Sequence, residues 1–184
     1  MISKKSIEVA KDSLRYLDSA RQEKLSKGIE IAESQLKSWD NTFIVIAKEL
    51  AKHSTCLRCQ VGAVLVKNGR IVSTGYNGVP HGMKHCNETF TTEDMKKSNW
   101  LDIHGEFSRK YEVHAEQNCI IEMAKNETNP TGTTLYLTLS PCSNCAKLIV
   151  AAGIERVVYA EEYDRDKDGI NLLKEMGIEC EKLS

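Results

Sequence analysis

The sequence predicts an α/β protein in which a five-stranded mixed sheet lies between layers of helices. Asn68-Gly69 separates two apolar runs, and this dipeptide favours the positive φ angles of a tight antiparallel hairpin. Three later strand-like segments alternate with helical ones, which indicates parallel strands joined by right-handed crossovers. An amphipathic stretch before the first strand adds an N-terminal helix to this α/β core.

The first 38 residues are predicted to form a helical extension, and residues 39–184 the main domain. Apolar residues recur at steps of three or four, or their multiples, between Lys4 and Ser38, namely Ile7, Ala10, Leu14, Leu17, Leu25, Ile29, Ala32 and Leu36. Gly28 costs about 1 kcal/mol relative to alanine within a helix, so one helix of about 35 residues and two shorter helices both remain open. We expect the apolar stripe to dock on the domain or on a sister subunit.

The main domain divides into segments whose patterns predict helices and strands in alternation. Asp40 is the expected N-cap of a helix over 42–53, and the hairpin strands follow at 61–66 and 70–75. Further helices are predicted at 114–125, 142–152 and 168–176, and strands at 133–139, 156–160 and 178–182. Gly153 and Gly177 fit helix C-caps. The chain turns polar between Asn77 and Val113, so residues 79–113 are an expected insertion or lid, with one short helix near 92–101.

The composition argues against several classes of partner. Lys and Arg total 25 against 26 Asp and Glu, and aromatic residues make up 6%, so no basic, aromatic-rich face for a long nucleic acid is evident. The N-terminal residues resemble neither a signal peptide nor a membrane span. The seven cysteines are an odd number, which favours reduced thiols or metal binding over disulfides. We therefore expect a cytoplasmic protein, or one in the host cytoplasm if the source is viral, with no membrane partner.

Four residues have the spacing of a catalytic zinc site. His114, Cys142 and Cys145 offer three nitrogen and sulfur ligands, which leaves the fourth position of a tetrahedral zinc open for water. A lone C-x-x-C pair is equally typical of a closed zinc knuckle or a redox pair. Glu116, two residues after His114, favours the catalytic interpretation, since its carboxylate lies within reach of the water without being a ligand.

This set of residues can remove an amine from a cytosine ring by hydrolysis. Glu116 takes a proton from the attacking water and delivers it to ring N3, while the resulting hydroxide adds to C4. Glu116 then protonates the departing amine, and ammonia is released. The combination of H-x-E with P-C-x-x-C is the signature of zinc-dependent nucleobase deaminases.

Further motifs surround the zinc pattern, and with them the chain resembles the deoxycytidylate (dCMP) deaminase family from about Ser38 to Ile178. The motifs are Ser38-Trp39-Asp40, Ser54-Thr55-Cys56-x-Arg58, Val61-Gly62-Ala63, Gly75-Tyr76-Asn77-Gly78 and the run from Ala146 to Ile154. The resemblance implies the three-layer α-β-α cytidine deaminase-like fold. It also implies a hydrolase that converts dCMP to dUMP, with release of ammonia, and so supplies dUMP for dTMP synthesis.

The resemblance also implies roles for residues around the zinc. Asn77 would contact the deoxyribose, the amide of Ala115 and the carbonyl of Ser140 would bind the cytosine edge, and Tyr163 would border the pocket. Relatives bind dCTP as activator and dTTP as inhibitor, with Mg²⁺ on the nucleotide, usually in a homohexamer. The corresponding effector residues here are Gly75, Tyr76, Asn77 and Gly78.

A second zinc, of structural type, is implied by the resemblance to phage and bacterial members. The matching ligands are Cys56, Cys86, His104 and Glu112. Such a metal would supply the folding energy that a polar insertion cannot obtain from buried apolar surface. Cys59 forms a C-x-x-C pair with Cys56 and is an alternative to Glu112, and His81 and His85 are further candidates.

Three other residues have simpler interpretations. Cys119 and Cys180 are expected to be small buried apolar side chains. Lys125 ends a predicted helix and suits its dipole, or else contacts a phosphate or a neighbouring subunit.

Two other functions would share some of these sequence features. A deaminase acting on tRNA or single-stranded DNA would use the same zinc chemistry, but the balanced charge argues against a polynucleotide groove. A non-catalytic nucleotide-sensing protein would have no need for the intact Glu116.

Overall fold

The computed structural model describes residues 3–183, and the chain divides into two compact units, Met1–Phe43 and Ile44–Ser184. Each unit has its own cluster of buried apolar side chains. Within the described residues, every helix is too short or too polar to cross a membrane.

The first unit consists of α1 (Lys4–Ser13), the 3₁₀ turn η1 (Leu14–Tyr16) and the beginning of α2 (Ser19–Ala51). The break between the helices falls at Asp18, whose carboxylate accepts a hydrogen bond of 3.0 Å from the amide of Arg21. Asp18 thus starts a new helix, whereas Gly28 lies within α2. The prediction that Asp40 caps a separate helix is wrong, because α2 continues through it.

The apolar stripe packs α1 on α2 within this unit. Its buried members are Ile7, Ile29 and Ala32, and its partly buried members are Ala10, Leu14, Leu25 and Leu36. An ion pair of 2.8 Å joins Lys11 to Glu33 on the flank of this cluster. The periodicity read from the sequence therefore identifies the contact surface of a helical hairpin.

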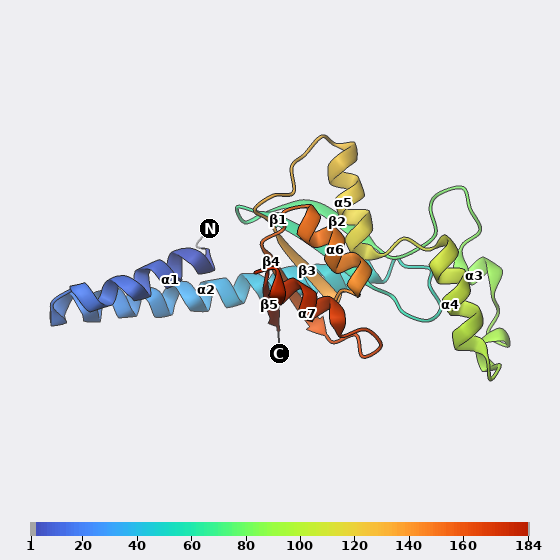
Figure 1. Cartoon of the computed structure of the whole chain (residues 1–184), viewed down its shortest axis with the longest axis horizontal. Coiled ribbons are helices and arrows are strands. Elements are labelled where there is room, and N and C mark those ends of the chain that lie inside the picture. The colour runs from blue at the N-terminus through green and yellow to red at the C-terminus, as the bar shows by residue number, and fades with distance from the viewer. Residues whose placement is uncertain (1–2, 184) are drawn as a thin grey trace. The chain divides into compact units, whose positions relative to one another are not determined.

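The second unit contains a mixed sheet with the strand order β2-β1-β3-β4-β5 (Figure 1). Its strands are β1 (Gly62–Lys67), β2 (Arg70–Tyr76), β3 (Thr134–Leu139), β4 (Arg156–Glu161) and β5 (Glu179–Lys182). Strand β1 pairs antiparallel with both β2 and β3, and the later pairs are parallel. The predicted fold class is confirmed, including the hairpin turn, where φ is 51° at Asn68 and 76° at Gly69.

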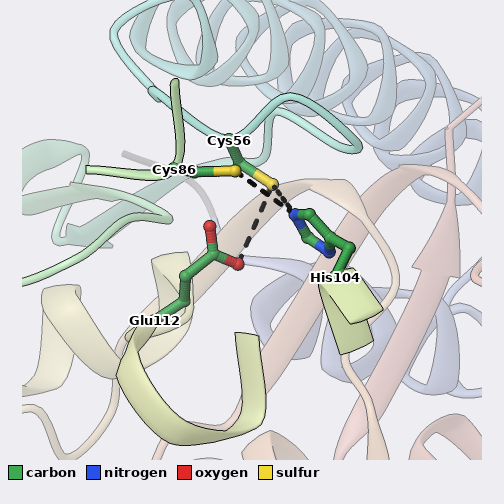
Figure 2. A group of neighbouring side chains, drawn as sticks. All are labelled: Cys56, Cys86, His104 and Glu112. Carbon is green, nitrogen blue, oxygen red and sulfur yellow. Dashed lines mark hydrogen bonds between the residues drawn. The ribbon is translucent and has the colours of Figure 1, made fainter. Parts of the chain in front are cut away.

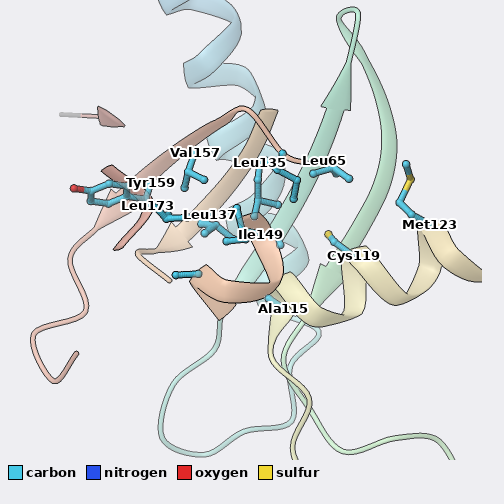
Figure 3. Close-up of a cluster of buried hydrophobic side chains, with 13 residues drawn as sticks. Leu65, Ala115, Cys119, Met123, Leu135, Leu137, Ile149, Val157, Tyr159 and Leu173 are labelled. Atoms are coloured by element: carbon cyan, nitrogen blue, oxygen red, sulfur yellow. The ribbon is translucent and has the colours of Figure 1, made fainter. Parts of the chain in front are cut away.

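Helices cover both faces of this sheet. One face packs against α5 (Ala115–Lys125), α6 (Ser143–Ala151) and α7 (Asp168–Glu175), and Figure 3 shows side chains such as Leu65, Leu137 and Ile149 in that core. The last turns of α2 lie against the other face, close enough that a side chain at Gly62 would collide with the carbonyl of Ala47. The N-termini of α5 and α6 lie next to each other, since Cys145 at the start of α6 contacts His114 just before α5.

The insertion between β2 and α5 is ordered by short elements and aromatic contacts. It contains α3 (Cys86–Thr89), the 3₁₀ turn η2 (Asp94–Lys96) and α4 (Trp100–Tyr111). The predicted helix at 92–101 is wrong, because that stretch is mainly turns, in which Asp94 accepts a hydrogen bond of 2.8 Å from the amide of Thr91. Phe90 packs edge-on against Trp100 and Phe107 at ring distances of 5.2 and 5.1 Å.

Candidate active site and second ligand cluster

Three predicted zinc ligands converge where α5 and α6 begin. His114 directly precedes α5, Cys142 directly precedes α6, and Cys145 lies in the first turn of α6. Nδ1 of His114 lies 3.7 Å from Sγ of Cys142 and 3.3 Å from Sγ of Cys145. All three ligand atoms lie within 4.8 Å of one another. We refer to these residues as the open cluster.

The open cluster fits a tetrahedral zinc ion. Zinc bonds of about 2.1 Å to nitrogen and about 2.3 Å to sulfur place two such atoms about 3.6 Å apart at the tetrahedral angle. The two observed N–S distances, 3.7 and 3.3 Å, lie on either side of this separation. One imidazole nitrogen and two sulfurs are a preferred zinc donor set, and three donors leave one position free.

The side chains of the open cluster interact strongly with one another. The Cys145 thiol donates to Cys142 and, together with His114, lowers the pKa of Cys142 to about 4. The same interaction raises the pKa of Cys145, and the hydrogen bond with Cys142 raises that of His114. The cluster therefore stabilises a thiolate at Cys142, which is the form that binds a metal.

Glu116 lies beside the open cluster in the first turn of α5. Its side chain is only 4% exposed, and burial raises the pKa of its carboxyl group. A raised pKa brings a carboxyl group closer to the neutral range, in which it can both accept and donate a proton. Glu116 lines the same cavity as His114 and Cys142.

That cavity has His114, Glu116 and Cys142 in its wall. The four residues that the resemblance implies for substrate binding all line it, namely Asn77, Ala115, Ser140 and Tyr163. The Asn77 side chain is already engaged, because it accepts from the amide of Val61 at 2.8 Å and donates to the carbonyl of Cys59 at 2.9 Å. Asn77 thus fixes the loop after α2 to the pocket wall.

Figure 2 shows a second cluster of donors, three of which, Cys56, His104 and Glu112, line the same cavity. It comprises Cys56, Cys86, His104 and Glu112, and we refer to it as the closed cluster. Nε2 of His104 lies 3.3 Å from Sγ of Cys56 and 3.5 Å from Sγ of Cys86. Sγ of Cys56 lies 3.8 Å from Oε2 of Glu112. The structure therefore brings together the four side chains named for a second metal.

The closed cluster has the features expected of a metal cage. Burial raises the pKa of Cys56 to about 12, raises that of Cys86 and lowers that of His104. Nδ1 of His104 and Oε1 of Glu112 are buried and find no hydrogen-bond partner within residues 3–183. The atoms that face one another are the two sulfurs, Nε2 of His104 and Oε2 of Glu112. A cation among them would favour the thiolates that burial opposes, and two sulfurs, one nitrogen and one oxygen complete a zinc shell.

The three alternative ligands lie outside the closed cluster in the described part of the chain. Cys59 is exposed and lines the cavity, and His81 is exposed in the loop after β2. His85 precedes α3 and contacts the hydroxyl of Thr55 at 3.3 Å. The geometry favours Glu112 over Cys59 as the fourth donor.

The remaining predicted residues have varied surroundings. Gly75 and Tyr76 are the last residues of the edge strand β2, and Gly78 follows it. The Tyr76 ring lies 6.0 Å from that of His53. Cys119 is buried and Cys180 is half-buried, in agreement with their interpretation as apolar side chains. Lys125 lies 4.0 Å from Glu122 on an exposed helix face.

A polar group at the cavity mouth was not predicted from the sequence. Arg58 and Ser108 line both the cavity and the adjoining outer depression, and Arg109 and Arg165 line the depression. Ser108 follows His104 by four residues on α4, so both side chains lie on one helix face. That spacing was a usable signal, but only after α4 had been located correctly.

An open three-donor metal set beside a buried carboxyl group defines the chain as a metal-dependent hydrolase of the deaminase type. Residues 37–161 match the model of the cytidine and deoxycytidylate deaminase zinc-binding region, and the chain belongs to this family.

The relatives include phage and cellular proteins. The deoxycytidylate deaminase of Enterobacteria phage T2 is 38% identical over 76% of this chain and 89% of the relative. The human deoxycytidylate deaminase is 37% identical over 71% of this chain and 68% of the relative. The crystal structure of cyanophage S-TIM5 dCMP deaminase with dCMP and dUMP has a TM-score of 0.64 and 35% identity, covering 77% of this chain and 94% of that one.

Proposed function

We propose that this protein is a zinc-dependent dCMP deaminase that hydrolyses dCMP to dUMP and ammonia. One observation carries the proposal: the buried Glu116 carboxyl group lines the same cavity as the open cluster. Relatives named deoxycytidylate deaminase, and a similar protein crystallised with dCMP and dUMP, support the choice of substrate.

The residues divide the work of this reaction among them. A zinc ion held by His114, Cys142 and Cys145 would polarise a water molecule and lower its pKa towards neutrality. Glu116 accepts a proton from that water and delivers it to ring N3. It then takes the proton of the hydroxyl group added at C4 and passes it to the amine, which leaves as ammonia while C4 becomes a carbonyl. Ala115 and Ser140 line the cavity beside it. The amide of Ala115 and the carbonyl of Ser140 would hold the cytosine edge.

The cavity mouth supports a nucleotide over a nucleoside. Arg58 and Ser108 line both the cavity and its outer depression, and Arg109 lies further out. A guanidinium and a hydroxyl are suitable donors for a 5′-phosphate, because charge-assisted hydrogen bonds to phosphate oxygens are strong. The base would then lie over Glu116 with its phosphate towards solvent.

The proposal is tested by ammonia release from dCMP, dCTP, deoxycytidine and a cytosine-containing oligonucleotide. We expect dCMP to be the best substrate, and Glu116→Gln to lower kcat by about 10²–10⁴-fold without loss of zinc. Glu122→Gln makes the same change on an exposed face of α5 and should retain full activity. Activity confined to the oligonucleotide would instead support a polynucleotide deaminase, and zinc-loaded protein inactive on all four would support a nucleotide sensor.

We also propose that a structural zinc binds the closed cluster. The convergence of two sulfurs, Nε2 of His104 and Oε2 of Glu112 supports this, because together they make a buried four-donor set. Elemental analysis should find two zinc ions per chain, and Cys86→Ser should reduce this to one. Cys180→Ser, a half-buried cysteine outside both clusters, is the matched control and should retain both ions. Unchanged zinc content in Cys86→Ser would contradict the second site.

The proposed regulation by nucleotides and the proposed oligomer rest on the resemblance to the dCMP deaminase family. Binding of dCTP and dTTP with Mg²⁺ near Tyr76, a homohexamer and a cytoplasmic location remain predictions. Sedimentation analysis tests the homohexamer, and the kinetics of dCMP turnover with and without dCTP or dTTP test the regulation. A monomer whose kinetics neither nucleotide changes would contradict both predictions.

A further inference from the structure

The loop that carries Cys142 is held from the side by the segment after β4. We call residues 140–143 the ligand loop and residues 161–169 the clamp segment. The amide of Ser140 donates to the carbonyl of Glu161 at 2.8 Å. In return, the Ser140 hydroxyl accepts from the amide of Tyr163, also at 2.8 Å. These bonds fix the start of the ligand loop.

Asp166 fixes the other end of the ligand loop. Its Oδ2 accepts from the amide of Ser143 at 2.9 Å, and its Oδ1 accepts from the Ser143 hydroxyl at 2.7 Å. Ser143 is the first residue of α6 and lies between the two cysteines of the open cluster. The hydrogen bonds from Ser143, followed by those from the amides of Gly169 and Asp168, lower the pKa of Asp166. One carboxylate thus joins the first turns of α6 and α7.

Gly169 brings α7 directly against the ligand loop. A side chain at this position would collide with the carbonyl oxygen of Pro141 and the backbone of Cys142. The clamp segment therefore contacts the backbone on both sides of Cys142 without supplying a metal ligand of its own.

The histidine of the open cluster is held independently. His114 begins α5, and its amide donates to the Gln117 side chain at 2.8 Å in a capping box. The open cluster consequently has two halves, one on α5 and one on the ligand loop with α6. Their relative geometry depends on contacts such as those of Asp166.

We propose that Asp166 is a positioning residue that orients Cys142 and Cys145 towards His114 for metal binding. The inference rests on the ligand set of the proposed function. Asp166 acts through Ser143 and through the backbone, in the way that residues behind metal ligands usually fix their orientation. Its negative charge opposes thiolate formation nearby, so its benefit must come from geometry.

Whether zinc affinity falls or rises in Asp166 variants distinguishes a geometric role of this side chain from an electrostatic one. Asp166→Asn keeps the shape of the side chain but removes the charge, and Asp166→Ala removes the hydrogen bonds to Ser143 altogether. Geometry predicts that Asn weakens zinc binding by about 3–10-fold and Ala by about 10–100-fold. A purely electrostatic role predicts tighter binding in the Asn variant. Asp164→Asn is the control, since it makes the same charge change in the clamp segment at an 85% exposed side chain.

The experiment measures zinc affinity by chelator competition and the visible spectrum of the cobalt-substituted full-length protein. The cobalt spectrum of Cys142→Ser reports the closed cluster alone, so subtracting it isolates the open cluster. We expect both Asp166 variants to alter the open-cluster bands. Both should bind zinc more weakly than the wild type, with the larger loss in Asp166→Ala. Asp164→Asn should match the wild type.

Wild-type affinity and an unchanged cobalt spectrum in both Asp166 variants would overturn the inference, even if their melting temperatures fell. Tighter zinc binding in Asp166→Asn would also overturn it. Failure of the proposed function is a different result, in which the wild type itself binds no zinc at the open cluster or releases no ammonia from dCMP.

Discussion

Residues of the open and the closed cluster line one cavity, yet the clusters differ in donor number and surroundings. The open cluster offers three donors, and Glu116 lies beside it. The closed cluster offers four donors, and two of its atoms are buried without partners among the described residues. Three donors leave a position for a reactant, whereas four complete the shell. Zinc could therefore act in catalysis at the open cluster and in stability at the closed cluster.

The clusters also differ in how the chain builds them. The ligands of the open cluster come from the starts of two neighbouring helices on the sheet. Those of the closed cluster come from the loop after α2 and from three places in the insertion, of which α4 carries His104. A metal in the closed cluster would thus join segments that share little apolar core. Loss of that metal should affect folding first and catalysis second.

The largest expected effect is the loss of catalysis in Cys142→Ser. Without the open-cluster zinc, dCMP turnover should fall by at least about a thousandfold, or about 4 kcal/mol of transition-state stabilisation. The melting temperature should change little, because the hydrophobic core beneath α6 is untouched. Steady-state kinetics and thermal unfolding check both points. Cys180→Ser is the control, and activity retained in zinc-depleted Cys142→Ser would contradict the assignment of the open cluster.

The next effect is the loss of stability in Cys86→Ser. Removing a structural metal should cost about 3–5 kcal/mol, which lowers the melting temperature by about 10 °C for a chain of this size. At temperatures where the variant remains folded, kcat should stay within about threefold of the wild type, because Glu116 and the open cluster are intact. Circular dichroism and kinetics at low temperature test this. A variant as stable as the wild type would show that the closed cluster needs no metal.

A smaller effect concerns Arg58, which follows Cys56 of the closed cluster by two residues and lines the cavity mouth. Arg58→Ala should raise KM for dCMP by about 10–100-fold, since a hydrogen bond to a charged group contributes about 1.5–3 kcal/mol. The kcat/KM for deoxycytidine, which lacks the phosphate, should remain nearly unchanged. Arg70→Ala, an exposed arginine on β2, provides the control. Equal losses on both substrates would argue against a phosphate contact.

The smallest effects distinguish the fourth donor of the closed cluster. Glu112→Gln should weaken zinc binding at that cluster by about tenfold, because a neutral amide replaces a carboxylate ligand. Cys59→Ser should leave the affinity within about twofold of the wild type, since Cys59 lies outside the cluster. Chelator competition measures both. The opposite ranking would identify Cys59 as the ligand and indicate that the loop rearranges when the metal binds.

The elements of the fold were predictable to different degrees. The sheet strands and the helices that cover its core face follow from periodicity and from Asn68-Gly69, because local pattern and burial agree there. The antiparallel pairing of β1 with β3 was not predictable from local pattern, since it depends on contacts between distant residues. Asp40 has the composition of an N-cap, but the continuous α2 overrides that preference.

The site residues likewise divide into those that local sequence spacing predicts and those that depend on distant contacts. His114, Glu116, Cys142 and Cys145 were predictable because their spacing on helix starts carries the chemistry. The roles of Arg58 and Asp166 depend on how separate loops approach one another, and no sequence spacing encodes that approach. The helix α4 was misplaced because its aromatic residues gain their order from contacts with Phe90 in the insertion.

The division of labour between the clusters is tested most directly by following three quantities on the same samples while a chelator removes metal. These are zinc per chain, ammonia release from dCMP and melting temperature. We predict two zinc ions per chain, with activity lost in step with one ion and thermal stability lost in step with the other. Activity and stability that fall together with a single ion, or dCMP turnover by zinc-free protein, would contradict the account.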